Sequence, residues 1–167
     1  MLGLSGRYHA ALSGLITTNE VKKSRPHLKM LVGDFYTYQV KSENEGSSPH
    51  CRVCIDENVN EGSSQKPPES LCHILTCCEA YSDIRMKYFQ EYSNLLQHSM
   101  SEVNFIELRS NNEMLCQFIL DPTSINLPIR INQNDPISSL LFKTSRDLCF
   151  MISERRIKII REKASKL

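Results

Sequence analysis

Five of the seven cysteines and two of the five histidines fall in one stretch of the sequence, SSPHCRVCIDENVNEGSSQKPPESLCHILTCCEAYS. Cys51 and Cys54 form a C-x-x-C pair, a spacing that lets two thiolates converge on one metal ion at about 2.3 Å. His73, Cys77 and Cys78 follow after a long insertion. Two soft ligands on a turn and two more on a helix are typical of a tetrahedral Cys3His site, so this pattern predicts a structural zinc ion.

The spacing alone leaves the identity of the last ligands open. Besides His73, the candidates for the remaining places are His50, Cys72, Cys77 and Cys78. If residues 70–97 form one continuous helix, His73 and Cys77 lie about 40° apart around its axis, whereas His73 and Cys78 lie about 140° apart. Helical geometry therefore favours Cys77, unless the helix ends or bends just after Leu75.

Burial of the thiols as small hydrophobic side chains is the alternative to a metal site. We favour that alternative for Cys116 and Cys149, because each stands singly on an apolar helical face. No βαβ pattern surrounds the C-x-x-C pair, which argues against a thioredoxin-like redox site. Nothing else in the chain resembles an acyl-transfer site, so a nucleophilic cysteine is not indicated.

The N-terminus lacks the pattern of a signal peptide, because it has no basic start and glycines interrupt its apolar residues. No stretch approaches the roughly 20 apolar residues needed to span a bilayer. We therefore expect an intracellular protein, of nucleus or cytoplasm, that has no membrane partner and keeps its thiols reduced. The odd number of cysteines also argues against a complete disulfide framework.

Apolar residues at helical spacing predict a mainly α fold, a small helical domain with a Cys3His zinc-binding loop-helix and a C-terminal amphipathic helix. Helices are expected over about residues 1–16, 24–33, 70–97, 101–120 and from Asp135-Pro136 into the C-terminal tail. Ile106, Leu140 and Met151 are among the side chains expected to face the core. The segment TTNEVKKS reads as a polar connector, and residues 55–69 read as a flexible insertion.

The chain divides into two regions on this interpretation. Residues 1–98 form a helical lead-in with the zinc-binding module, and residues 99–167 form a helical tail that packs on it. Net charge is only +1 overall, but residues 143–167 carry eight Lys/Arg against three Asp/Glu, and residues 1–54 carry seven against four. Basic ends indicate an anionic partner, although a solvated basic helix face is the alternative.

Contacts to the phosphates of an anionic partner are predicted for the basic residues near the zinc motif and in the tail. These residues are Lys22, Lys23, Arg25, Lys29, Arg52, Arg155, Arg156, Lys158 and Arg161. His27 lies among these cations in the sequence, and we expect it at the protein surface.

The motifs SPHCRVC and ESLCHILTCCEAY resemble the zinc-binding segment near the C-terminal end of reverse transcriptases from jockey-like non-LTR retrotransposons. That segment reads S-P-x-C-x-x-C, then E-[ST]-x-x-H-[IL]-L-x-x-C-x-x-[YL]. The matching residues are Pro49, Cys51, Cys54, Glu69, Ser70, His73, Ile74, Leu75, Cys78 and Tyr81. The resemblance covers residues 24–92 and implies zinc on Cys51, Cys54, His73 and Cys78, with Cys77 as the runner-up for the last place. It also implies that residues 34–41 are helix-like.

Catalytic motifs are missing from the sequence. There is no Tyr-x-Asp-Asp turn, no P-loop, no Gly-rich dinucleotide turn, and no acidic set typical of an RNase H or an endonuclease. We therefore expect no enzyme and no small-molecule substrate. The resemblance implies a non-catalytic, zinc-stabilised C-terminal module that assists a reverse transcriptase domain in RNA or DNA binding. The alternative is a structural or protein-interaction helical module, or a degenerate mobile-element remnant, without nucleic-acid contact.

Overall fold

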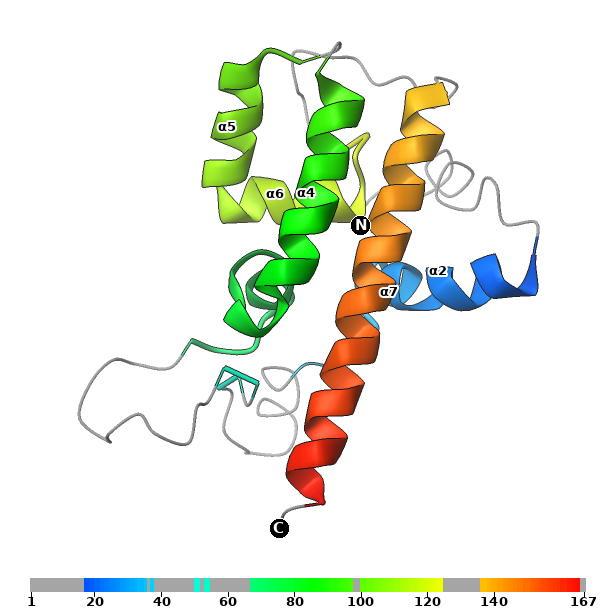
Figure 1. Cartoon of the computed structure of the whole chain (residues 1–167), viewed down its shortest axis with the longest axis vertical. Helices are drawn as coiled ribbons and strands as arrows, with labels where there is room; N and C mark the ends of the chain where they lie inside the picture. Colours follow the sequence, from blue (N-terminus) through cyan, green and yellow to red (C-terminus); the bar gives the residue numbers. More distant parts are fainter. Residues whose placement is uncertain are drawn as a thin grey trace.

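The structure is a computed structural model that describes residues 17–35, 37, 50–51, 53–54, 67–97, 100–124 and 136–165. These residues form helices and connecting turns, and no β-strand occurs among them (Figure 1). The predicted mainly α fold is therefore confirmed. The helix expected over residues 1–16 lies outside the described part of the chain.

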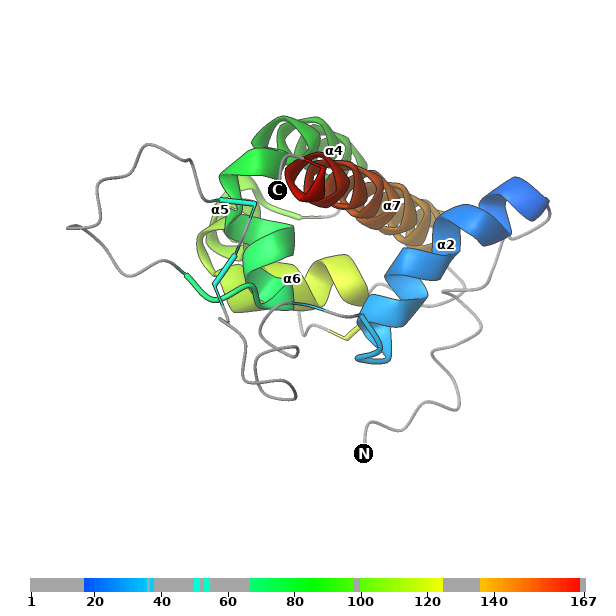
Figure 2. The same ribbon diagram turned by 90° about the horizontal axis from the view of Figure 1, so that it is seen from below.

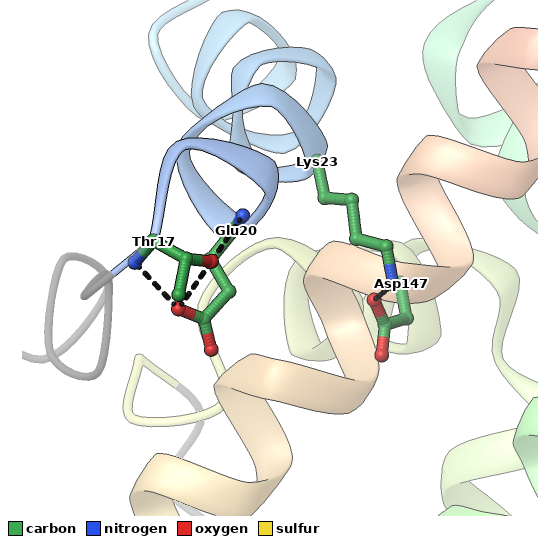
Figure 3. A network of polar contacts seen from close by, with 4 residues as sticks. All are labelled: Thr17, Glu20, Lys23 and Asp147. Atoms are coloured by element: carbon green, nitrogen blue, oxygen red, sulfur yellow. Dashed lines mark hydrogen bonds and ion pairs between the residues drawn. The ribbon is translucent and has the colours of Figure 1, made fainter.

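Helix α2 (Thr18–Leu31) begins six residues before the expected start at Ser24. Thr17 and Glu20 form a capping box: the Glu20 N–H donates to Thr17 Oγ1 at 3.2 Å, and the Thr17 N–H donates to a Glu20 carboxylate oxygen at 2.9 Å (Figure 3). The segment TTNEVKKS is therefore the beginning of a helix and not a connector. The Thr-x-x-Glu spacing is the sequence signal that identifies this start.

His27 lies in the core, which contradicts its expected surface position. It shares the buried face of α2 with Ser24 and Met30, and its Nε2–H donates to the Leu120 carbonyl oxygen at 2.9 Å. The edge of its ring approaches Phe142, with 6.4 Å between ring centroids. The longer α2 explains this placement, because the helix packs one continuous face, which includes Ser24, His27 and Met30, against the rest of the protein.

Gly33 ends α2, as expected. Its φ of 78° is a left-handed conformation that glycine adopts without steric penalty. The Asp34 N–H donates to the Lys29 carbonyl oxygen at 2.8 Å and the Gly33 N–H to that of Met30 at 3.3 Å, which is a Schellman motif. Because this motif turns the chain away from the helix axis, Asp34 and Phe35 are not helical. Thr37 is not helical either, and the rest of the expected segment 34–41 lies outside the described residues.

Replacing Gly33 with alanine is expected to lower the free energy of unfolding by about 1 kcal/mol, since a Cβ disfavours the left-handed conformation. No atom lies within 4 Å of the added Cβ, so steric overlap adds nothing to this cost. Urea unfolding measures the change. Gly33→Asn is the control, because asparagine tolerates this conformation better. An equal loss in both variants would contradict the conformational explanation.

The helix expected over residues 70–97 is interrupted. A π-helical turn, η1 (His73–Cys77), is followed by the 3-10 turn η2 (Glu79–Tyr81) and then by α4 (Ser82–Leu96). Cys78, between the first two, has a ψ of 119°, which lies outside the helical region.

The helix expected over residues 101–120 is two helices, α5 (Glu102–Ser110) and α6 (Asn112–Leu120). Asn111 separates them in an extended conformation, and its side chain accepts the Met114 N–H at 3.0 Å as the N-cap of α6. This break reorients α5, so that Ile106 is 60% exposed instead of facing the core.

Helix α7 (Pro136–Ala164) packs against α2, α4, α6 and the turn η1. Its start at Pro136 agrees with the predicted one, although Asp135 lies outside the described residues. Helix α4 runs beside α7 in the opposite direction, and α2 crosses it (Figures 1 and 2). The core-facing side chains of α7 include Leu141, Leu148, Cys149 and Ile152. Leu140 and Met151 are instead 46% and 42% exposed, because they flank that face.

Two polar contacts fix the neighbours of α7. The Tyr92 hydroxyl of α4 lies 2.8 Å from the Ser145 hydroxyl in the core. Lys23 of α2 reaches Asp147 of α7 at 3.4 Å (Figure 3). The main hydrophobic core contains buried residues from both predicted regions. Cys116 and Cys149 belong to it, so their predicted burial is confirmed.

Candidate metal centre

Cys51, Cys54, His73 and Cys78 form a compact cluster, in which one ligand atom from each residue lies within 4.8 Å of all the others. The Cys54 sulfur lies 3.2 Å from His73 Nε2 and 3.1 Å from the Cys78 sulfur, and the Cys51 and Cys78 sulfurs are 4.0 Å apart. Ligands about 2.3 Å from a tetrahedral ion stand roughly 3.8 Å from one another. This Cys3His group can therefore hold a metal ion with little rearrangement.

The π-helical turn explains why Cys78 and not Cys77 joins the cluster. The Cys78 N–H donates to the His73 carbonyl oxygen at 2.8 Å, which is an i to i+5 hydrogen bond. In such a turn the fifth residue, and not the fourth, returns to the side of the first. The expectation that helical geometry favours Cys77 was wrong because it assumed an α-helix. Cys77 is exposed, and its sulfur lies 3.2 Å from the Thr76 hydroxyl.

The C-x-x-C side of the cluster is held by the end of the segment that was expected to be a flexible insertion. The Cys51 N–H donates to the Pro67 carbonyl oxygen at 3.1 Å, and His50 and Pro68 form an isolated antiparallel bridge. The chain before Cys51 is thus tied to the chain before Glu69. Residues 55–66 lie outside the described part of the chain.

Backbone contacts position the other two ligands. Ser70 Oγ accepts the His73 N–H at 3.0 Å, which fixes the start of the π-helical turn. Arg85, buried in α4, donates to the Cys78 carbonyl oxygen at 2.5 Å and so holds the chain where it leaves the turn. Sequence reasoning did not single out Arg85, since nothing local marks an arginine seven residues away as a partner of the ligand.

The thiols influence one another electrostatically. The hydrogen bond to Cys78 lowers the pKa of the Cys51 thiol, whereas that contact and then burial raise the pKa of Cys78. Burial also raises the pKa of Cys54. A metal ion must therefore displace protons from Cys54 and Cys78, which makes metal binding weaker in acid.

The predicted phosphate-binding residues of α2 fall into two groups. Lys22, Arg25 and Lys29 are exposed and, at spacings of three and four residues, lie on one face of the helix. We call these three residues the α2 basic stripe. Lys23 instead forms an ion pair with Asp147, and Arg52 lies outside the described residues.

The predicted phosphate-binding residues of α7 also differ in their surroundings. Lys158 and Arg161 are exposed near the C-terminal end of the helix. Arg155 forms an ion pair with Asp83 at 2.5 Å. The Arg156 side chain is only 13% exposed and forms an ion pair with Glu69, which does not fit the expected phosphate contact.

Comparison of the chain with protein-family models, with curated proteins and with solved structures gives no match. The resemblance to reverse transcriptases therefore stays a prediction from the sequence motifs. No helix in the described ranges is both long enough and apolar enough to cross a membrane.

Proposed function

We propose that the chain is a non-catalytic helical module stabilised by one structural zinc ion on Cys51, Cys54, His73 and Cys78. The cluster of four ligand atoms within 4.8 Å carries this proposal. Three sulfurs and one imidazole favour zinc over the hard cations calcium and magnesium, which prefer oxygen ligands. Four protein ligands fill a tetrahedral shell and leave no position for water or substrate, as in structural zinc sites.

The same proposal gives the module a role in binding RNA or DNA through phosphates. The α2 basic stripe supports it, because three exposed cations on one helix face can contact successive phosphates. Lys158 and Arg161 add exposed cations on α7. The sequence resemblance supports placing this module beside a reverse transcriptase catalytic domain, as the C-terminal part of a non-LTR retrotransposon protein.

A structural or protein-interaction module without nucleic-acid contact is the second candidate. The pairing of Lys23 with Asp147, Arg155 with Asp83 and Arg156 with Glu69 favours it, since these cations serve contacts within the chain. The net charge of +1 favours it as well.

Two measurements on protein purified without chelator test the proposal. Elemental analysis should find one zinc ion per chain. Titration of single-stranded RNA and duplex DNA at several salt concentrations should show an affinity that falls steeply as salt rises. Absence of zinc would overturn the structural part, and negligible binding at low salt would leave the second candidate.

Neutralising the α2 basic stripe is expected to weaken nucleic-acid binding and to flatten its salt dependence. The triple variant Lys22→Gln, Arg25→Gln, Lys29→Gln loses up to three phosphate contacts. The slope of log affinity against log salt should then fall by about 2 for a single strand. Fluorescence anisotropy at four or more salt concentrations measures both quantities.

The matched control for the α2 basic stripe removes the same charges elsewhere. Lys87, Arg109 and Lys143 are exposed on α4, α5 and α7, and their change to glutamine also removes two lysines and one arginine. This control should retain most of the affinity and most of the slope. Equal effects of the two triple variants would mean that net charge acts, without a binding face on α2.

A further inference from the structure

Glu69 is a buried carboxylate placed against the metal cluster. It is fully buried, and one of its oxygens lies 3.7 Å from the Cys51 sulfur. Its other oxygen accepts a hydrogen bond from Arg156 Nη2 at 2.5 Å. Glu69 therefore connects the cluster to α7: it contacts Cys51 with one oxygen and Arg156, 87 positions later in the sequence, with the other.

A second contact holds the Arg156 guanidinium in this position. Its guanidinium lies over the Phe35 ring, 5.6 Å from the ring centroid, just after the end of α2. The preceding residue, Arg155, reaches Asp83 in the first turn of α4 and lies 3.5 Å from the Ala80 carbonyl oxygen. These two successive arginines of α7 thus contact opposite flanks of the segment that carries His73 and Cys78, and of the two Arg156 contacts the carboxylate beside the cluster.

The charges at this place require a cation. A divalent ion with three thiolates and a neutral imidazole carries a net charge of −1. Glu69 adds a second negative charge beside Cys51, and bulk solvent does not reach it there because it is fully buried. Arg156 is a cation in contact with Glu69, so it offsets this repulsion without contacting any of the four cluster residues through that ion pair.

We propose that Arg156 is a positioning residue of the metal centre: it neutralises Glu69 beside the thiolates and, through this ion pair, ties the basic end of α7 to the occupied site. The inference rests on the zinc binding proposed above and adds a regulation to it. Lys158 and Arg161 follow Arg156 by two and five residues, or about 3 and 7.5 Å along the helix axis. Metal occupancy therefore sets where these exposed cations are held.

Zinc affinity in charge variants tests the electrostatic half. In Arg156→Gln, the Glu69 carboxylate loses this ion pair beside the thiolates, and we expect zinc affinity to fall about 10- to 100-fold, as for other outer-shell partners of metal ligands. Adding Glu69→Gln to this variant removes the carboxylate beside Cys51 and should restore the affinity to within about threefold of wild type, since replacing both members of a buried pair costs far less than removing one. Competition with a chelator of known zinc affinity measures all three proteins.

The neighbouring ion pair provides the matched control. Arg155→Gln with Asp83→Asn removes an exposed pair from the same helix and the same module, and zinc affinity should change less than twofold. An Arg156→Gln variant within twofold of wild type would overturn the inference. So would a double variant at Glu69 and Arg156 that binds zinc no better than Arg156→Gln, because the role of Arg156 would then be packing alone.

Hydrogen exchange tests the tether, and its first comparison uses only wild-type protein with and without zinc. In wild-type protein, removing zinc should speed amide exchange at residues 152–160 of α7 at least tenfold more than at residues 141–149. In the double variant at Glu69 and Arg156, zinc should no longer protect residues 152–160 selectively. Equal acceleration along all of α7 on zinc removal would overturn the tether.

Failure of the inference and failure of the proposed function are distinguishable. Wild-type protein that binds no zinc removes the metal site itself. Wild-type protein that binds one zinc ion, with the same affinity in Arg156→Gln, keeps the metal site and removes only the role of Arg156.

Discussion

Replacing Cys78 with serine is expected to abolish tight zinc binding and to unfold the segment around the cluster, whereas replacing the adjacent Cys77 with serine should leave both intact. Structural zinc contributes on the order of 10 kcal/mol to the folding of small domains, so the loss of one thiolate ligand is a large effect. Cys78 lies in the cluster and is buried, while Cys77 points to solvent. This is the largest difference we expect from any pair of neighbouring substitutions in the chain.

Cys77 cannot take the place of Cys78 in the cluster without a large loss of stability. The turn would have to rewind from π to α geometry, and every residue after it would shift by one position. Tyr81 and Ile84 are buried just downstream, and Arg85 holds the Cys78 carbonyl oxygen, so this shift would disrupt packed contacts. Zinc per chain and far-ultraviolet circular dichroism of the two variants decide the matter. Zinc lost in Cys77→Ser and kept in Cys78→Ser would show that the turn is α-helical in solution.

Acid is expected to destabilise the protein through His27 by about 3 kcal/mol between pH 6.5 and pH 4. Burial lowers the pKa of His27 from 6.5 to about 4, because the folded protein desolvates the charged imidazole. Arg146 also lowers this pKa, whereas the Leu120 carbonyl and Asp121 raise it. The folded state thus favours neutral His27, so its stability contribution is complete above pH 6.5 and is lost as pH falls toward 4.

The comparison of wild type with His27→Gln isolates this contribution. Glutamine can still donate to the Leu120 carbonyl oxygen but does not titrate in this range. Unfolding free energies measured at saturating zinc should show the wild type losing about 3 kcal/mol relative to the variant between pH 6.5 and 4. Acid also displaces metal from the thiolates, but that effect is common to both proteins and cancels in the difference. Parallel pH profiles would contradict a neutral, buried His27.

The four residues of the candidate metal centre could be predicted from the sequence because they occur in two short motifs. The C-x-x-C pair indicates one local turn, and the following histidine and cysteine indicate another. The spacing within each motif therefore identifies most of the residues of the cluster. The choice between Cys77 and Cys78 depends on the turn type: an α-helical turn favours Cys77, whereas the π-helical turn brings Cys78 into the cluster. The start of α2 was missed although its Thr17–Glu20 capping box was readable.

The partners of the metal centre could not be predicted in the same way. Glu69 and Arg156 are 87 residues apart, and no local pattern distinguishes Arg156 from the other cations of the tail. Burial decides the difference, since Arg156 faces the centre while Lys158 and Arg161 face solvent. The same holds for His27, which looks like part of a basic surface patch in the sequence. Which face of a helix is covered depends on the helices that pack on it.

The π-helical turn at His73–Cys77 has a consequence for how such sites can be recognised in other chains. A π turn contains one residue more than an α turn, and its hydrogen bond joins residues i and i+5 in place of i and i+4. A chain one residue shorter between histidine and cysteine would place the same two ligand atoms together from an ordinary α turn. The H-x3-C and H-x4-C spacings are therefore two solutions to one coordination geometry. A motif search that admits only one of them will divide related metal centres into separate groups.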